Sequence, residues 1–246
     1  MSNYKTVSNI PFITKQEMIE VDRLMVKKYH ISLIQMMENA GRNLASLARN
    51  LFFHGDVSNK KIFVLAGHGA NGGGALVSAR HLINWGADVK IIISKDETEF
   101  SGVPKIQLEI LKNMCANIFQ FNQIKNDFNT DLIIEGLVGY SLNGSPRGTL
   151  KDIIEFANDL PVKKLSLDVP AGIDLSVCKA MKPAFFADAV LTLALPKKGM
   201  QKEEIKKYIK QLYLADISVP SSLYKLLPSE LLISNIFSES EIVRVW

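Results

Sequence analysis

The sequence predicts an α/β protein built on a doubly wound, mostly parallel β-sheet. Short apolar segments alternate along the chain with segments of helical periodicity, and glycine-rich turns separate several of them. This alternation is typical of βαβ units, in which a helix crosses over between parallel strands. The expected strands cover residues 62–66, 89–93, 118–121, 131–137, 164–169, 187–194 and 212–217.

Helices are expected between these strands and before the first of them. Two extra helices precede the sheet at 14–29 and 32–50, and Thr14 and Glu17 form a capping box at the start of the first. These two helices are free to cover one face of the sheet or to contact a partner. Later helices are expected at 101–114, 149–158 and 201–211, and a polar surface loop at 122–130.

The composition favours one large domain, residues 1–246, because 47% of the residues are hydrophobic and 22% are charged. The net charge is only +4 and no basic cluster alternates with aromatic residues, so a nucleic-acid partner is not expected. The lysine-rich segment 197–210 is interpreted as the solvent face of a helix. Cys115 and Cys178 are expected to be free thiols. Because there is neither a membrane-length apolar run nor a signal peptide, we expect a cytoplasmic protein without membrane contact.

The first βα turn is the strongest local signal. Gly67, Gly69 and Gly72 match the pattern G-x-G-x-x-G between a strand and a helix, and Asp96 follows the next strand. Such a turn lets the backbone approach a ligand closely, and the helix that starts there presents free N–H groups to an anion. A glycine-rich turn without any ligand is the alternative. A Walker-type phosphate loop is excluded because no Gly-Lys-Ser/Thr follows.

Two further loops leave expected strands next to a carboxylate. Glu135 precedes the loop at 139–147, and Asp168 opens the segment 168–174. Because ligands of open parallel sheets bind beyond the carboxyl ends of the strands, these loops are expected to meet the glycine loop at one edge. Partial desolvation at a strand end suits a carboxylate for acid/base chemistry. Capping of a loop is the alternative role for a single such carboxylate.

Several longer strings resemble the NAD(P)H-hydrate epimerase family. Residues 67–82, GHGANGGGALVSARHL, resemble the family pattern G-P-G-N-N-G-G-D-G-L-V-x-A-R-H-L. Further similar segments follow the family's order between Thr14 and Pro220: MENAG, DLIIEGLVGYSLNGSPRG, LSLDVPAGID, ADAVLTLALPKKGM and ADISVP. The resemblance implies a Rossmann-like, three-layer αβα fold, a frequent homodimer, and interconversion of the R and S forms of hydrated NADH or NADPH.

The resemblance also implies roles for individual residues. Asp168 corresponds to the aspartate of the family's D-x-P-S-G motif and is the implied catalytic acid/base, in contact with the hydrated nicotinamide. The implied substrate-binding residues are Ala70, Asn71, Gly72, Gly73, Gly74, Gly139, Tyr140, Ser141, Leu142, Asn143, Gly144, Ser145, Arg147 and Asp168.

Potassium ligands are implied at Asn71, Glu135 and Ala171, but two of these positions depart from the family pattern. Glu135 stands in place of a shorter aspartate, and Ala171 stands in place of a serine. A hard cation requires oxygen ligands at well-defined distances, so we expect weak or absent potassium binding. Ala70 and Gly74 also depart, replacing an asparagine and a substrate-contacting aspartate.

Two other functions remain open from the sequence. The departures favour a catalytically impaired nucleotide-binding, protein-binding or dimerisation module on the same fold. The glycine fingerprint alone favours a nicotinamide-dependent dehydrogenase, which ranks last because no catalytic His–Asp or Tyr–Lys pair is evident.

Overall fold

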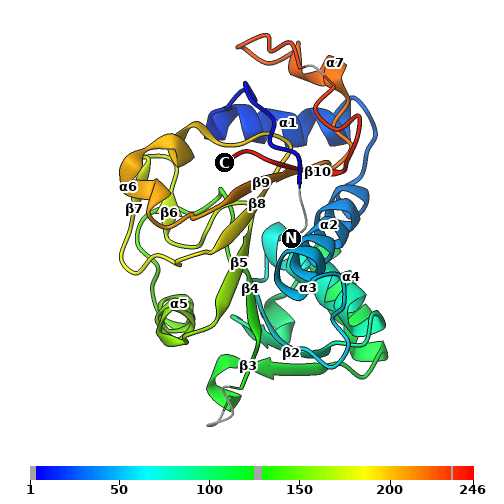
Figure 1. Ribbon diagram of the computed structural model, residues 1–246, viewed down its shortest axis with the longest axis vertical. Helices are drawn as coiled ribbons and strands as arrows, with labels where there is room; N and C mark the ends of the chain where they lie inside the picture. The colour runs from blue at the N-terminus through cyan, green and yellow to red at the C-terminus, as the bar shows by residue number, and fades with distance from the viewer. Residues whose placement is uncertain (1–3, 125–128, 234) are drawn as a thin grey trace.

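The computed structural model describes residues 4–124, 129–233 and 235–246 and confirms the α/β class (Figure 1). Its main sheet has eight strands in the order β10-β9-β8-β5-β4-β1-β2-β3. Neighbouring strands pair in parallel except β10, which is antiparallel to β9. The strands are β1 Lys61–Ala66, β2 Asp88–Ile93, β3 Asn117–Gln120, β4 Leu132–Gly136, β5 Lys163–Leu167, β8 Ala189–Leu193, β9 Leu212–Ala215 and β10 Ile242–Arg244. A separate hairpin pairs β6 Ile173–Asp174 with β7 Lys179–Ala180.

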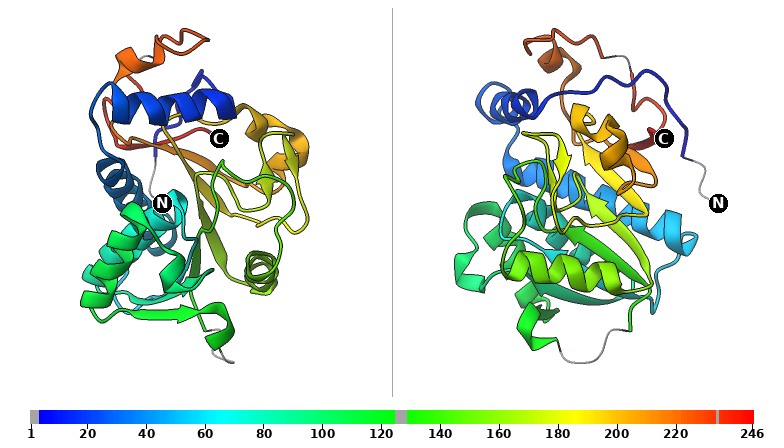
Figure 2. Two further views of the ribbon diagram at one scale, coloured as in Figure 1. Left: turned by 180° about the vertical axis from the view of Figure 1, so that it is seen from behind. Right: turned by 90° about the vertical axis from the view of Figure 1, so that its left-hand side faces the viewer.

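Helices cover both faces of the sheet, as the two views of Figure 2 show. In β1, Ile62 and Val64 belong to an apolar cluster with α2, α3 and α4, whereas Phe63 and Leu65 belong to a cluster with α5. Both faces are therefore buried, which explains the uninterrupted apolar runs of the strands. The helices are α1 Lys15–Lys27, α2 Leu33–Phe53, α3 Ala70–Asn84, α4 Gly102–Asn113, α5 Thr149–Asp159, α6 Glu203–Lys206 and α7 Ser221–Tyr224. Short 3-10 turns are η1 Glu97–Glu99, η2 Phe121–Gln123 and η3 Lys198–Gln201.

The direction of strand addition reverses between β1 and β4. From β1 the chain continues to β2 and β3 on one side, and from β4 to β5, β8 and β9 on the other. Open parallel sheets bind ligands at such a reversal, outside the carboxyl ends of the strands. The glycine loop leaves β1 and a second loop leaves β4 at Leu137, so the topology brings these two loops together.

The two N-terminal helices are confirmed, and α1 begins at the expected capping box. The Glu17 backbone N–H donates to Thr14 Oγ1 at 3.1 Å, and the Thr14 N–H donates to Glu17 Oε2 at 2.8 Å. Met18 and Met25 of α1 pack in a third apolar cluster with the start of α2, the end of β8 and the C-terminal segment. In Figure 1, α1 lies across the upper end of the sheet, where it forms a wall of the cleft described below.

The expected helix at 201–211 is wrong, because only Glu203–Lys206 is α-helical there. Ile205 and Ile209 are both buried and imitate a helical spacing, but Ile209 forms an isolated bridge with Ala187 that leads the chain into β9. Strand β10 and the β6–β7 hairpin were not expected, since segments of two or three residues carry no usable periodicity.

The expected loop at 122–130 lies partly outside the described residues, which exclude 125–128. Among the helices of the described ranges, none combines the length and apolar character needed to cross a membrane.

Candidate active site

The glycine loop is held tightly between β1, α3 and the loop that follows β4. A Cβ on Gly67 would lie 1.9 Å from the Leu137 carbonyl oxygen, and a Cβ on Gly72 would lie 1.7 Å from that of Gly67. No side chain caps the N-terminus of α3, where Gly69 is the N-cap. The N–H groups of the first helical turn have no partners within the helix, so this end of α3 suits an anionic group.

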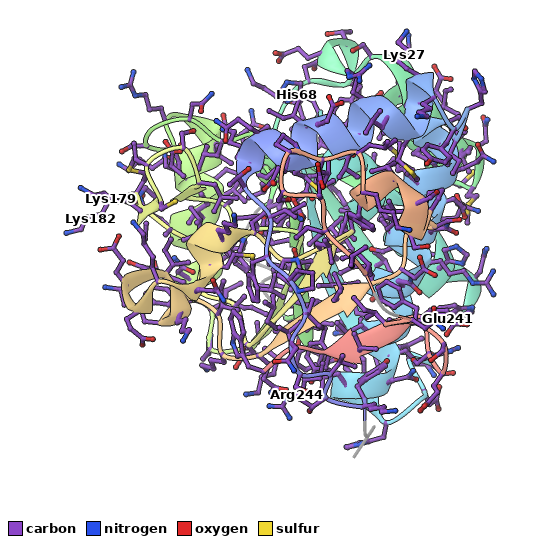
Figure 3. All side chains as sticks on the ribbon, turned by 90° about the horizontal axis from the view of Figure 1, so that it is seen from above. Lys27, His68, Lys179, Lys182, Glu241 and Arg244 are labelled. Carbon is purple, nitrogen blue, oxygen red and sulfur yellow. The ribbon has the colours of Figure 1, made fainter. Side chains whose placement is uncertain are left out.

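A cavity of about 320 Å³ opens beside this helix end. Its walls come from α1, α2, the glycine loop, residues 137–141, the end of β5 and the segment after β9. Most of the lining is apolar, with Met18, Met36 and Met37 prominent, and its polar groups include Asp22, Asn71, Tyr140 and Asp168. The exposed His68 also lines the cavity, and Figure 3 shows it beside α1. A mostly apolar cavity with a few polar groups is typical of a small-molecule site.

Asp168 lies at the sheet end of this cavity, immediately after β5. Its backbone adopts a left-handed conformation, with φ of 63°, and its side chain is only 5% exposed. The carboxylate forms a buried ion pair with Lys197. The Tyr140 backbone N–H donates to Asp168 Oδ2 at 3.3 Å, and the Thr192 hydroxyl lies 3.4 Å from Oδ1. Asp168 is thus an ion-paired carboxylate in the cleft that also accepts a hydrogen bond from the loop after β4.

Lys197 corrects the interpretation of 197–210 as a solvent-facing helix. Its side chain is 1% exposed, and Nζ donates to Thr192 Oγ1 at 3.1 Å and to the Leu193 carbonyl at 2.9 Å as well as to Asp168. The neighbouring Lys198 is exposed. The sequence did not distinguish the two lysines, because both lie in the same lysine-rich segment.

A second carboxylate in the cavity was also missed. Asp22 projects from α1, and the Tyr140 hydroxyl donates to its Oδ2 at 2.5 Å. Burial raises the pKa of the Tyr140 phenol, and the adjacent Asp22 charge raises it further. The sequence gave no motif for Asp22, because only the tertiary fold places α1 over this loop.

The structure brings together seven of the implied substrate residues as lining of the cavity: Ala70, Asn71, Gly74, Gly139, Tyr140, Ser141 and Asp168. Gly72 and Gly73 are buried beneath them, where a Cβ on Gly73 would meet the Met37 sulfur at 2.4 Å.

The remaining implied residues do not line the cavity, and three of them form hydrogen bonds with neighbouring segments instead. Lys15 Nζ donates to the Leu142 carbonyl at 3.2 Å and to Asn143 Oδ1 at 2.9 Å. The Gly144 N–H donates to Asp174 at 2.7 Å. Ser145 and Arg147 are exposed.

Glu135 is fully buried, and its oxygens are used within the chain. Oε1 accepts from the Leu137 N–H at 2.6 Å, and Oε2 accepts from the Ser166 hydroxyl at 2.6 Å and the Ala171 N–H at 3.3 Å. Burial raises the pKa of this carboxyl to about 7, although these hydrogen bonds oppose the shift.

The potassium site implied by the resemblance does not fit these residues. Both Glu135 oxygens already accept hydrogen bonds from backbone N–H groups, and Ala171 has no side-chain oxygen. We therefore derive no chemical step through potassium.

The position of Gly74 is likewise filled from within the chain. A Cβ there would lie 2.7 Å from Leu167 Cδ2. An aspartate at this position would require Leu167 to move. The Leu167 side chain therefore occupies the space next to Gly74, where the family pattern has an aspartate.

Fold and cleft together define an α/β protein with a small-molecule site at the switch point of a parallel sheet. The chain belongs to the family described as YjeF-related protein N-terminus, whose model matches residues 33–199. It is 36% identical over 216 residues to the NAD(P)H-hydrate epimerase of Dehalogenimonas lykanthroporepellens, covering 86% of this chain and 84% of that protein. It is 30% identical over 224 residues to the NAD(P)H-hydrate epimerase of Rhodopirellula baltica, covering 90% of both.

The fold is also shared with a solved structure. The yeast protein ynu0, YNL200c, superposes with a TM-score of 0.77 at 22% sequence identity, covering 96% of this chain and 100% of the yeast chain. This similarity supports the Rossmann-like three-layer arrangement.

Proposed function

We propose that this protein is an isomerase that interconverts the R and S epimers of hydrated NADH and NADPH. The observation that carries the proposal is the buried Asp168–Lys197 pair at the base of an apolar cleft beside the N-terminus of α3. Relatives that this chain covers over most of their length are named NAD(P)H-hydrate epimerases, which supports the same activity.

The cleft suits the two chemically different ends of such a nucleotide. The methionines of α1 and α2 offer an apolar, adaptable surface to the hydrated nicotinamide ring. The first turn of α3, at Ala70 and Asn71, offers N–H groups and a positive helix end to a phosphate. Asp168 lines the same cavity, which supports its contact with the ring in this proposal.

Asp168 supplies the acid/base function in this proposal. Epimerisation requires the ring carbon that carries the hydroxyl to lose its configuration, either by departure of the hydroxyl or by opening of the ring. Both routes move a proton on or off an oxygen at that carbon and leave the overall composition unchanged. Asp168 exchanges this proton, and Lys197 balances the charge of the carboxylate in the desolvated site.

The experiment compares Asp168→Asn with wild-type protein and with Asp131→Asn as the matched control. Asp131 is an exposed carboxylate that accepts a hydrogen bond from the Lys61 N–H. It lies at the amino-terminal ends of β1 and β4, opposite to the end that carries the cavity. Epimerisation by Asp168→Asn should fall by about a hundredfold or more, the usual scale of acid/base catalysis. ADP-ribose binding should persist in Asp168→Asn, and Asp131→Asn should keep wild-type turnover. Wild-type turnover in Asp168→Asn would contradict the assignment.

A nucleotide-binding module without catalysis is the second candidate. Two observations favour it. The Glu135 carboxylate forms its hydrogen bonds within the chain, and Gly74 lies against Leu167, so neither position offers a polar group to a substrate. Wild-type protein that binds ADP-ribose but does not change the R:S ratio of either substrate would support this candidate.

A further inference from the structure

We infer that Asp22 is a second proton-exchanging group of this site, acting on the face of the substrate ring opposite to Asp168. The inference rests on the proposed epimerase function. It is carried by the arrangement of Asp22, Tyr140 and Asp168 around the cavity.

Tyr140 connects the two carboxylates through different atoms. Its backbone N–H donates to Asp168 Oδ2 at 3.3 Å, whereas its hydroxyl donates to Asp22 Oδ2 at 2.5 Å. The two carboxylates therefore contact opposite ends of the same tyrosine. Asp168 enters from the end of β5 and Asp22 enters from α1, and both line the cavity.

Epimerisation makes use of two such groups. When the hydroxyl leaves as water, one group donates a proton to the departing oxygen while the C–O bond breaks. The lone pair of the adjacent ring nitrogen then forms a C=N bond. A water molecule adds to the other face, and the group on that face accepts its proton. One proton enters and one leaves, so atoms and charge balance, and the reverse reaction exchanges the two roles.

The surroundings of Asp22 suit a group that carries a proton. Burial raises the pKa of the Asp22 carboxyl, and the nearby Asp168 charge raises it, whereas the Tyr140 hydrogen bond and the Lys197 charge lower it. These three ionisable groups face Asp22 from the loop after β4, the end of β5 and the segment after β8. Asp168, by contrast, is in direct contact with an ammonium. Two carboxylates in such different environments are typical of acid/base pairs.

Tyr140 acts as the positioning residue of Asp22. Its hydroxyl stabilises the ionised form of Asp22, so Tyr140→Phe should raise the pKa of Asp22 further. If the two carboxyl groups, Asp22 and Asp168, must together hold one proton for activity, kcat/KM falls at high pH when that proton is lost. In Tyr140→Phe this fall should move to higher pH, equally in both directions because the R:S equilibrium does not depend on pH.

The test measures pH profiles of epimerisation for wild type, Asp22→Asn, Asp22→Glu and Tyr140→Phe. Glu20→Gln, on the same helix but paired with Arg23 at the surface, is the control. We expect kcat of Asp22→Asn to fall by about a hundredfold. Its ADP-ribose affinity and melting temperature should stay near those of wild type, and Asp22→Glu should recover part of the activity.

Each other outcome has a defined meaning. Turnover of Asp22→Asn within threefold of wild type overturns the inference and leaves the proposed function intact. Loss of activity together with loss of ADP-ribose binding and of thermal stability assigns Asp22 a structural role and also overturns it. If Asp22→Asn does not fold, an unshifted profile in Tyr140→Phe overturns it. Wild-type protein without epimerisation removes the proposed function and this inference together.

Discussion

At the scale of single residues, the site depends on charged groups that the fold removes from water. Asp168 and Lys197 are both buried, and each has the other as its counter-charge. Sequence patterns identified Asp168 because it ends a strand in a recognisable motif. They missed Lys197 and Asp22, since nothing local separates a buried lysine or aspartate from exposed ones.

Removing one member of the buried pair should be costly for stability. Lys197→Met leaves the Asp168 carboxylate buried without its counter-charge, which should lower the free energy of unfolding by about 3–5 kcal/mol. The double variant Asp168→Asn/Lys197→Met removes both charges and should lose less than Lys197→Met alone. Urea unfolding measures these differences, with the exposed Lys198→Met as control. A loss below about 1 kcal/mol for Lys197→Met would contradict the pairing.

Glu135 should make stability fall with rising pH. Burial raises its pKa in the folded protein to about 7, above the ordinary value of 4.5. Between pH 4.5 and pH 7, the Glu135 carboxyl is therefore protonated in the native state and ionised in the unfolded state. The stability contributed by the protonated form is complete below about pH 4.5 and is lost as pH rises through 7.

The matched comparison for this effect is Glu135→Gln, which cannot ionise. Between pH 5 and pH 8, wild type should lose about 2–3 kcal/mol relative to Glu135→Gln, because each pKa unit corresponds to about 1.4 kcal/mol. Urea unfolding at the two pH values measures the change. A constant difference between the two proteins would show that the pKa of Glu135 is not raised.

At the scale of elements, long periodic segments were predictable and short ones were not. The β1–loop–α3 unit and the capping box of α1 follow from local sequence, because apolar periodicity and glycine chemistry act within a few residues. The 201–211 segment misled because Ile205 and Ile209 are buried for tertiary reasons. Strand β10 depends on its antiparallel pairing with β9, which no local pattern contains.

The glycine loop allows a matched test of backbone packing. Gly72→Ala places a Cβ 1.7 Å from the Gly67 carbonyl oxygen, whereas Gly69→Ala meets nothing within 4 Å. Gly72→Ala should lower stability by about 1–3 kcal/mol and weaken ADP-ribose binding, because the loop must open to relieve the contact. Gly69→Ala should change the melting temperature much less than Gly72→Ala. Equal effects of the two substitutions would contradict the tight packing of this loop.

At the scale of the whole molecule, the homodimer stays a prediction. The sequence MMENAG at residues 36–41 offers methionines and small residues for a close-packed contact between two copies, but the structure points to other side chains of the same helices. Met36, Met37 and Ala40 of the MENAG region are buried within the chain and are not available to a partner. The same two helices instead expose Ile19, Val26, Leu33 and Ile34, each by 38–50%. Apolar side chains at such exposure suit contact with a second copy.

Light scattering should therefore give about twice the 27.4 kDa chain mass at micromolar concentration. Ile19→Asp combined with Leu33→Asp should reduce the mass to that of one chain, whereas Ile106→Asp on α4 should not. A wild-type monomer under these conditions would rule out the dimer.

The central claim is that this cleft interconverts two epimers, and progress curves from both sides test it most directly. Pure R and pure S hydrated NADH are each incubated with wild-type protein, and the epimers are resolved by chromatography or proton NMR. The account predicts that both reactions converge on one R:S ratio faster than the spontaneous rate, without any change of redox state. Curves that match the protein-free controls from both sides would contradict it.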